Sequence, residues 1–393
     1  MSATSTMSAT STMSATSSTT GALAPVYLRA TGVYLPGPPI GNDEMESYLG
    51  TVHCRPSRAR ALALRHNGIR ARHYALDRHG RPTHSSAELA TQAVRDAFAR
   101  QRGLHLRDTD HLAVAGSFGD RLLPGLASPV QHALGLDGIG IASFQSVCGA
   151  AAMALQSAWM HVACGARRQA VVVGSEFVSR ILRGSYLEPA RLASREHGVE
   201  NLEVEFLRWT LSDGAGAAVF APTPAADGPS LRLDWVDVAS YAPRFDVCMQ
   251  LGAGRDSWAS YASPVEAAAD GAFCLRQDFR TLRRMFPVWV QRLRDLGEVH
   301  GFAPDDVDAF LCHFSSYALG REVMEVMRDA RFLVPEARWY SNLRERGNTG
   351  AASIFVMLDE FLRVRAPRRG QRVLLCIPES GWGLVAHAMF TAT

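Results

Sequence analysis

Short apolar runs alternate with amphipathic stretches along most of the chain from residue 26 onward. The runs at 112–117, 168–176 and 371–377 each contain an uninterrupted apolar stretch, as expected of buried strands. Between such runs, apolar residues recur at helical spacing, for example Leu89, Val94 and Phe98 within 86–101. Strands that alternate with helices in this way predict α/β architecture.

The predicted elements fall into two series of similar design. The first has strands at 26–36, 112–117, 139–144, 168–176 and within 211–220, and helices at 44–49, 86–101, 129–134 and from 148 onward. The second has helices at 276–296, 319–328 and 355–362, and strands at 309–313, 371–377 and one ending at 390. We expect Asn42 to cap the helix at 44–49. The irregular stretch 240–270 is too long for a simple loop and predicts a lid or a pocket wall.

Residues 1–20 repeat the hexamer Met-Ser-Ala-Thr-Ser-Thr and cannot bury a core. We therefore expect a disordered low-complexity tail over 1–24, in which the repeated methionines allow a later start at Met7 or Met13. The tail has neither the arginines of a transit peptide nor the apolar stretch of a signal peptide. The folded part is expected to divide into halves at 25–221 and 222–393.

Composition narrows the class of protein. Apolar residues make up 47% and charged residues 20%, which is typical of a globular chain, and no apolar run is long enough to predict a membrane span. The net charge is +3 and every basic residue other than histidine is a scattered arginine, which argues against nucleic acid and suits an acidic protein partner. Seven cysteines without paired spacing indicate a reducing, cytoplasmic compartment.

The candidate chemistry centres on Cys148, which stands where an alanine-rich helix is expected to begin. The first N–H groups of a helix have no intrahelical partner and the helix dipole is positive there, so a thiolate is favoured. The alternative is an ordinary buried cysteine. Asn348 has the same setting in the second half, and His313 follows a predicted buried strand. We expect Asp213 to fix a glycine turn by accepting backbone N–H groups.

Five motifs, in this order along 26–390, resemble those of the thiolase superfamily in its ketoacyl synthase III branch, which starts fatty-acid and polyketide chains. They are Ser-Val-Cys-Gly-Ala at 146–150, Val-Gly-Ser-Glu at 173–176, Ser-Asp-Gly-Ala-Gly-Ala at 212–217, Cys-His at 312–313 and Gly-Asn-Thr-Gly-Ala-Ala-Ser at 347–353. The resemblance implies a thiolase-like five-layered αβαβα fold, built from two duplicated halves that bring Cys148, His313 and Asn348 together. It also implies a homodimer; a heterodimer with another synthase subunit is the alternative assembly.

The resemblance further implies decarboxylative condensation. Cys148 takes an acyl group from a thioester, and a malonyl-type thioester then loses carbon dioxide and attacks the acyl-enzyme to give a β-ketoacyl thioester. His313 and Asn348 donate hydrogen bonds to the thioester oxygen on which charge develops. The backbone N–H groups of Cys148 and of the Ser380-Gly381 turn form the oxyanion hole. No metal or bound cofactor is implied, since acyl groups arrive on the phosphopantetheine of an acyl carrier protein or on coenzyme A.

Several positions depart from the family pattern. The histidine is followed by Phe-Ser-Ser-Tyr at 314–317 in place of Gln-Ala-Asn, and Glu379 opens a turn where a glycine triplet is usual. Leu62 stands where coenzyme-A-binding members carry a tryptophan, which favours a carrier-protein donor. Extra length in 177–212 and 221–312 suggests a remodelled pocket, and these departures together favour the specialised-metabolite branch.

Two other functions remain open. The first is an acyltransferase of the same fold that moves the acyl group from Cys148 to a hydroxyl or an amine. The second is a non-catalytic subunit that supports a partner synthase.

Overall fold

The computed structural model describes residues 23–188, 202–225, 230–252 and 258–393. The expectation of a disordered tail therefore lies outside the described residues over 1–22, as does part of the added length in 177–212. None of the helices in the described ranges is long and apolar enough to cross a bilayer.

The strands of both halves form one continuous sheet. Its N-terminal half runs β5 (Gly140–Gln145), β4 (His111–Gly116), β6 (Ala170–Glu176), β7 (Gly214–Ala221) and β1 (Val26–Tyr34). Its C-terminal half runs from β8 (Leu231–Ser240) through β14 (Leu384–Ala392), β13 (Arg372–Pro378) and β11 (Ala309–Cys312) to β12 (Trp339–Tyr340). The halves join where Val26–Leu28 of β1 pairs with 231–233 of β8. If the five strands of each half are numbered along the chain, their order from the outer edge of the sheet inward is 3-2-4-5-1 in both halves. The topology of the first half is therefore repeated in the second.

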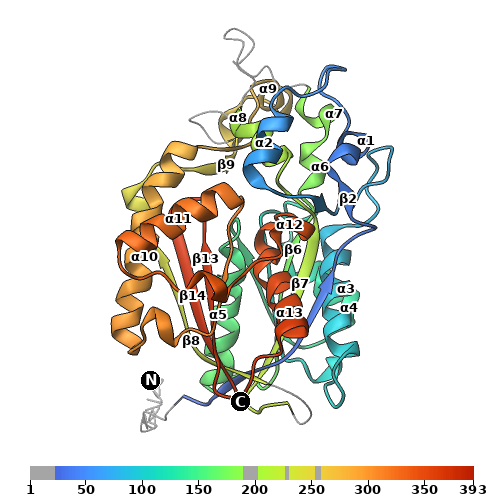
Figure 1. The fold of residues 1–393 in the computed structure, drawn as a ribbon. Helices are drawn as coiled ribbons and strands as arrows, with labels where there is room; N and C mark the ends of the chain where they lie inside the picture. The colour runs from blue at the N-terminus through green and yellow to red at the C-terminus, as the bar shows by residue number, and fades with distance from the viewer. Residues whose placement is uncertain (1–22, 189–201, 226–229, 253–257) are drawn as a thin grey trace, which may run out of the picture.

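The two halves of the sheet form two layers, and helices form the other three (Figure 1). The middle layer holds α5 (Ala150–Ala163), which contacts β4, β6 and β8, and α13 (Ser353–Arg365), which contacts β1, β7 and β11. On the outer face of the N-terminal half lie α3 (Ser86–Ala99) and α4 (Ala127–Leu134). On the outer face of the C-terminal half lie α10 (Phe279–His300) and α11 (Tyr317–Asp329). The predicted αβαβα layering is confirmed.

Shorter elements gather at one end of the sheet, at the top of Figure 1. They are the helices α1 (Met45–Leu49), α2 (Arg60–Asn67), α6 (Ser179–Leu182), α7 (Gly184–Leu187), α8 (Leu202–Arg208) and α9 (Pro264–Ala269), and the paired strands β2 (Ile40–Gly41) with β3 (Ala71–Arg72) and β9 (Met249–Leu251) with β10 (Leu275–Gln277). A further short helix, α12 (Leu343–Arg346), precedes the segment that leads into α13. Of the predicted pocket wall at 240–270, the structure describes β9 and α9, while residues 253–257 lie outside the described residues.

The middle layer packs closely because small residues face it. A Cβ atom at Gly174 of β6 would lie 2.5 Å from the carbonyl oxygen of Ala351, and one at Gly216 of β7 would lie 2.7 Å from Cβ of Phe355. The alanines at the start of α5 are fully buried. These positions let the segment around α13 approach the sheet of the other half without steric conflict.

Two local predictions were wrong. Asn42 does not cap the helix at 45–49, because its side chain instead donates to the carbonyl of Ile69 and accepts from Arg72. The helix after Cys148 begins at Ala150, because Cys148 and Gly149 form a turn that precedes it. The prediction for Asp213 is confirmed in one respect, since its carboxylate accepts backbone N–H groups, but these belong to Ala75 and Ser179 in other segments and not to its own turn.

Candidate active site

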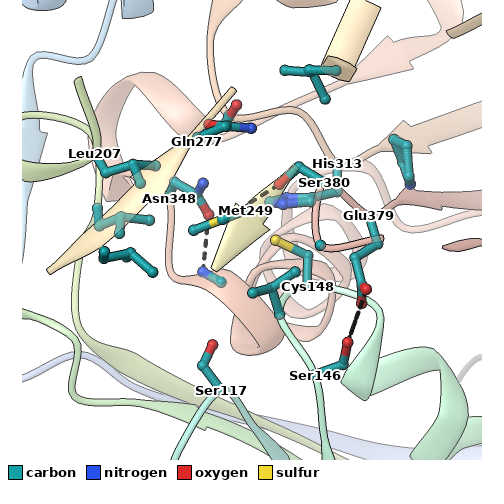
Figure 2. Close-up of a pocket in the computed structure, with 18 of the residues that line it drawn as sticks. Ser117, Ser146, Cys148, Leu207, Met249, Gln277, His313, Asn348, Glu379 and Ser380 are labelled. Carbon is teal, nitrogen blue, oxygen red and sulfur yellow. Dashed lines mark hydrogen bonds between the residues drawn. The ribbon is translucent and has the colours of Figure 1, made fainter. Parts of the chain in front are cut away.

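Cys148 lies in the turn between β5 and α5 and lines a cavity of about 360 Å³. Its side chain is 9% exposed. The same cavity is lined by His313, Asn348, Ser380 and Gly381. The structure therefore brings all five residues singled out in the sequence to one place, although they come from four separate segments (Figure 2).

The thiol of Cys148 is protonated in the unliganded protein. Burial raises its pKa well above the usual range, and the carboxylates of Glu379 and Glu176 raise it further. The backbone N–H of Cys148 acts in the opposite direction, since it stabilises the thiolate. The expectation that a helix start favours a thiolate is therefore outweighed here by burial and by two nearby carboxylates.

His313 follows β11 directly, and its backbone N–H donates to the carbonyl of Cys376 on β13 at 2.9 Å. Its side chain is buried, and burial lowers its pKa to about 4. The imidazole is therefore neutral near pH 7. A neutral imidazole carries one N–H, which suits a hydrogen-bond donor to a developing anion.

Asn348 is held by its own loop. Its Oδ1 accepts the N–H of Gly350 at 2.9 Å and the hydroxyl of Ser353 at 3.3 Å, an assignment of the amide that follows from these donors. Gly347 before it has φ of +70°, a conformation that favours glycine. Because the oxygen is engaged, the Nδ2 group is the part of the amide left to donate.

Glu379 is a buried carboxylate that the sequence marked only as a departure from a glycine pattern. It accepts the hydroxyl of Ser146 at 2.8 Å and the N–H of Gly149 at 2.8 Å, so it binds on both sides of Cys148 (Figure 2). Burial raises its pKa, and these two hydrogen bonds act in the opposite direction. The carboxylate occupies donors at the start of α5 that would otherwise stabilise a thiolate.

Glu176, at the end of β6, joins the two halves beneath the cavity. Its Oε1 accepts the backbone N–H and the hydroxyl of Ser117 and the N–H of Ala351, at 3.0, 2.8 and 3.1 Å. Burial raises its pKa to about 7. Glu176 therefore ties the loop after β4 to the segment that carries Asn348.

Ser380 and Gly381 lie in the turn between β13 and β14. The carbonyl of Gly381 accepts the N–H groups of Cys248 and Met249, and the hydroxyl of Ser380 contacts the sulfur of Met249 at 3.3 Å. Within the described residues, the backbone N–H groups of Ser380 and Gly381 have no acceptor. The turn thus lines the same cavity as Cys148 and carries two backbone N–H groups without an acceptor among the described residues.

The rest of the cavity wall is mostly apolar. It includes Phe118, Val178, Leu207, Leu211, Leu251, Leu275, Leu282, Phe286, Trp289, Leu319 and Val323. No arginine or aspartate of the described residues is among the cavity residues. Leu62 lies outside the cavity on α2 and is 46% exposed. Among all residues that the structure describes, no group of three or more His, Cys, Asp or Glu side chains is placed to hold a metal ion.

The chain is similar to known proteins in both sequence and structure. A family described as 3-oxoacyl-[acyl-carrier-protein] synthase III C terminal matches residues 298–392. The chain is 28% identical over 348 residues to acetoacetyl CoA synthase NphT7 of Streptomyces sp. (strain CL190), which covers 88% of this chain and 92% of that protein. The structure of 3-oxoacyl-(acyl carrier protein) synthase III, FabH, from Pseudomonas aeruginosa PAO1 matches with a TM-score of 0.69 and 25% identity, over 93% of this chain and 98% of that one.

The chain is similar in sequence and fold to β-ketoacyl synthases of type III. It is a transferase of the condensing-enzyme type. The ketoacyl-synthase-III-like fold also matches AbyA1, a tetronic acid condensing enzyme, with a TM-score of 0.74 and 24% identity over 93% of this chain and 99% of that one. The similar proteins therefore include both 3-oxoacyl-(acyl carrier protein) synthases III and a tetronic acid condensing enzyme.

Proposed function

We propose that this protein joins a Cys148-bound acyl group to a malonyl-type thioester on an acyl carrier protein, with loss of carbon dioxide, to give a β-ketoacyl thioester. The observation that carries the proposal is the single cavity lined by a buried cysteine, a neutral histidine and an asparagine whose Nδ2 is left to donate. Decarboxylative condensation needs a nucleophile and neutral hydrogen-bond donors.

In the first half-reaction, the sulfur of Cys148 attacks the carbonyl carbon of an acyl thioester. The bond between that carbon and the donor's sulfur breaks, and the donor leaves as a thiol with the proton that Cys148 gives up. Negative charge develops on the carbonyl oxygen in the tetrahedral intermediate. The backbone N–H groups of Cys148 and of the Ser380-Gly381 turn are the proposed donors to that oxygen.

In the second half-reaction, the bond to the malonyl carboxylate breaks and carbon dioxide leaves. The electron pair passes to an enolate, whose oxygen accepts hydrogen bonds from the neutral imidazole of His313 and the amide of Asn348. The carbanionic carbon then attacks the acyl carbonyl, and Cys148 departs as a thiolate. A neutral His313 is needed here because an imidazolium would transfer a proton to the enolate and quench it.

An acyl carrier protein is the donor that the surface favours. Exposed arginines lie on adjoining elements at one face, namely Arg65 on α2, Arg70 after it, Arg321 on α11 and Arg344 on α12. Arg70 donates its N–H to the carbonyl of Arg344, whose guanidinium lies 5.2 Å from the ring of Tyr317 at the start of α11. Such a basic patch suits an acidic partner such as an acyl carrier protein. Leu62 stands where coenzyme-A-binding members carry a tryptophan, so the indole that those members have at this position is missing.

The proposed pathway is specialised metabolism, with the protein acting in the cytoplasm as a homodimer. The departures at 314–317 and at Glu379 and the similarity to AbyA1 support the first part. All seven cysteines are unpaired, which suits a reducing compartment. The free edge of β5 supports the dimer, because this strand pairs only with β4 among the described strands.

An acyltransferase that moves the acyl group to an alcohol or an amine is the second candidate. It needs Cys148 and a base for the incoming nucleophile, but it has no enolate to stabilise. A fixed Asn348 amide that complements His313 favours condensation.

The proposal is tested by separating the two half-reactions in Asn348→Ala. We expect acylation of Cys148 to change less than about threefold, while decarboxylation of a malonyl carrier protein falls about 100-fold or more, as for the loss of one oxyanion donor. The matched control is Asn342→Ala, since Asn342 lies outside this cavity. Equal loss of both half-reactions in Asn348→Ala contradicts the assigned role, and transfer without carbon dioxide release favours the acyltransferase.

A further inference from the structure

Gln277 is a fully buried polar residue in the mostly apolar part of the cavity wall. Gln277 ends β10 and is 1% exposed. It pairs with Met249 across the β9–β10 ribbon, while Leu275 pairs with Leu251. All four residues line the cavity, as expected for side chains that share one face of an antiparallel ribbon. Figure 2 shows Gln277 and Leu207 on one side of the cavity and Cys148 and Ser146 on the other.

The amide of Gln277 is unsatisfied. Neither its oxygen nor its nitrogen has a hydrogen-bond partner within the described part of the chain. Trp289 on α10 also lines the cavity, is 5% exposed, and has an indole N–H without a partner among the same residues. Buried polar groups are nearly always hydrogen-bonded, because leaving one unpaired costs stability. Two such groups on one cavity therefore point to a ligand that pairs with them.

We infer that Gln277 and Trp289 form a polar subsite that binds a neutral hydrogen-bonding group of the thioester substrate. This inference rests on the proposed function. The subsite offers donors from both side chains and one acceptor from the Gln277 amide, which match a hydroxyl, a ketone or an amide. A charged group fits poorly, because none of the described residues that line the cavity is an arginine that could pair with a carboxylate, and burial of an unpaired charge is unfavourable.

The group can belong to either part of the substrate. It is an oxygen function on the acyl chain or an amide of the pantetheine arm, and both present the same hydrogen-bonding chemistry. In either case the subsite selects the substrate that carries the group over an analogue that lacks it. Sites built to hydrogen-bond a substrate group discriminate strongly against such analogues, since their own polar atoms are then left unpaired.

The test compares two substrate series. The first consists of hexanoyl pantetheine and derivatives with one hydroxyl at each chain carbon in turn. The second compares hexanoyl pantetheine with hexanoyl N-acetylcysteamine, which lacks one amide of the arm. The rate of Cys148 acylation is followed by intact mass for wild type, Gln277→Leu and Trp289→Phe, which keeps an aromatic side chain but removes the five-membered ring that carries the N–H. Gln291→Leu, on the exposed side of α10, is the matched control.

We expect the wild type to prefer one member that carries the polar group by about tenfold or more. Gln277→Leu and Trp289→Phe should reduce that preference at least about threefold, with Gln291→Leu unchanged. Loss of preference in the first series places the group on the acyl chain, and loss in the second places it on the arm. Unchanged preferences in both series for both variants overturn the inference.

Binding of the same compounds to Cys148→Ala, measured by calorimetry, keeps this test independent of acyl transfer. If the wild type loads no member and is not loaded by acyl carrier proteins either, the proposed function fails. The subsite is then still decided by whether Gln277→Leu, placed in the Cys148→Ala background, removes the binding preference. Retention of that preference in the double variant contradicts the subsite.

Discussion

At the scale of single residues, the environment of Cys148 is set by a carboxylate that lies more than two hundred positions away in sequence. Glu379 accepts hydrogen bonds from Ser146 and Gly149, and its charge adds to the effect of burial in raising the pKa of Cys148. A thiol that is protonated at rest reacts slowly with stray electrophiles. The cost is a smaller thiolate fraction when an acyl thioester arrives.

Glu379→Gln should therefore load faster at neutral pH. Removing the negative charge lowers the pKa of Cys148, so the thiolate fraction at a given pH rises. The loading rate should therefore begin to increase at a lower pH than in the wild type. We expect a gain on the order of tenfold at pH 7, the size of effect that one nearby charge produces at an effective dielectric near 20.

The measurement is the pH profile of Cys148 acylation from pH 6 to 10, with Glu345→Gln as a control on the exposed side of α12. An unchanged profile in Glu379→Gln would show that its charge does not act on the thiol. A fall in rate at every pH would assign it a role in holding the turn at 146–149 instead.

The sequence identified Cys148, His313 and Asn348 because each stands in a local motif that can be read without the fold. It did not identify the role of Glu379, because that role depends on contacts between the first and the second half of the chain. Gln277 and Trp289 were missed for a similar reason. Nothing in a glutamine at 277 or in an aromatic residue on an amphipathic helix indicates that its polar atoms lack partners.

At the scale of elements, Cys148 lies just before the middle-layer helix α5 of one half, and Asn348 lies just before the middle-layer helix α13 of the other. These two parts of the chain meet because glycines on β6 and β7 leave room for the segment 350–355. Glu176 then bonds to the N–H of Ala351, which fixes that segment relative to β6. Packing of the middle layer and alignment of the site are therefore coupled.

Gly174→Ala tests this coupling. Its Cβ would lie 2.5 Å from a backbone oxygen that cannot move alone, so we expect destabilisation of about 1–3 kcal/mol and a loss of condensing activity in the folded fraction. Gly41→Ala is the matched control, since its φ is −72° and its nearest neighbour lies at 3.9 Å. That variant should be unchanged or more stable by about 0.4–1 kcal/mol.

Chemical denaturation with far-UV circular dichroism measures both variants. Equal stability of Gly174→Ala and wild type would mean that the middle layer is less tightly packed than the structure indicates.

Most elements could be predicted from periodicity, and α3, α4 and α10 lie within a few residues of their predicted positions. The start of α5 and the role of Asn42 could not. Both depend on side chains elsewhere in the chain. The carboxylate of Glu379 accepts the N–H of Gly149, and the guanidinium of Arg72 donates to the side chain of Asn42. Local capping patterns do not contain such long-range competitors.

At the scale of the whole molecule, the sheet ends at β5 with one side unpaired within the described chain. Side chains alternate in exposure along this strand, and Ile141 on it is 39% exposed. The nearby loop carries Leu122 and Leu123, which are 89% and 84% exposed. An open strand edge beside exposed apolar side chains is unfavourable in a monomer, so a second copy is the expected cover.

Ile141→Asp should therefore shift the protein from dimer to monomer, because the carboxylate would be buried without a partner in the interface. Light scattering coupled to gel filtration gives the mass directly. Val299→Asp, a valine that is 73% exposed near the end of α10, is the control and should remain dimeric. A monomeric wild type, or an Ile141→Asp variant that stays dimeric, contradicts this interface.

The duplicated, layered fold could be predicted because the two halves repeat one pattern of motifs. The shape of the cavity could not, since its walls come from segments such as β9, β10 and α10 that have no counterpart in the motifs. The acyl group that fits the cavity is therefore a property of the whole molecule.

The most direct test of the account is the intact mass of the protein after exposure to acyl carrier proteins and acyl coenzyme A thioesters, followed by malonyl carrier protein. The account predicts that the wild type gains one acyl group, that Cys148→Ala gains none while keeping its fold, and that malonyl carrier protein removes the group with release of carbon dioxide. An acyl group retained on Cys148→Ala, or one discharged only onto an alcohol or an amine, would contradict it.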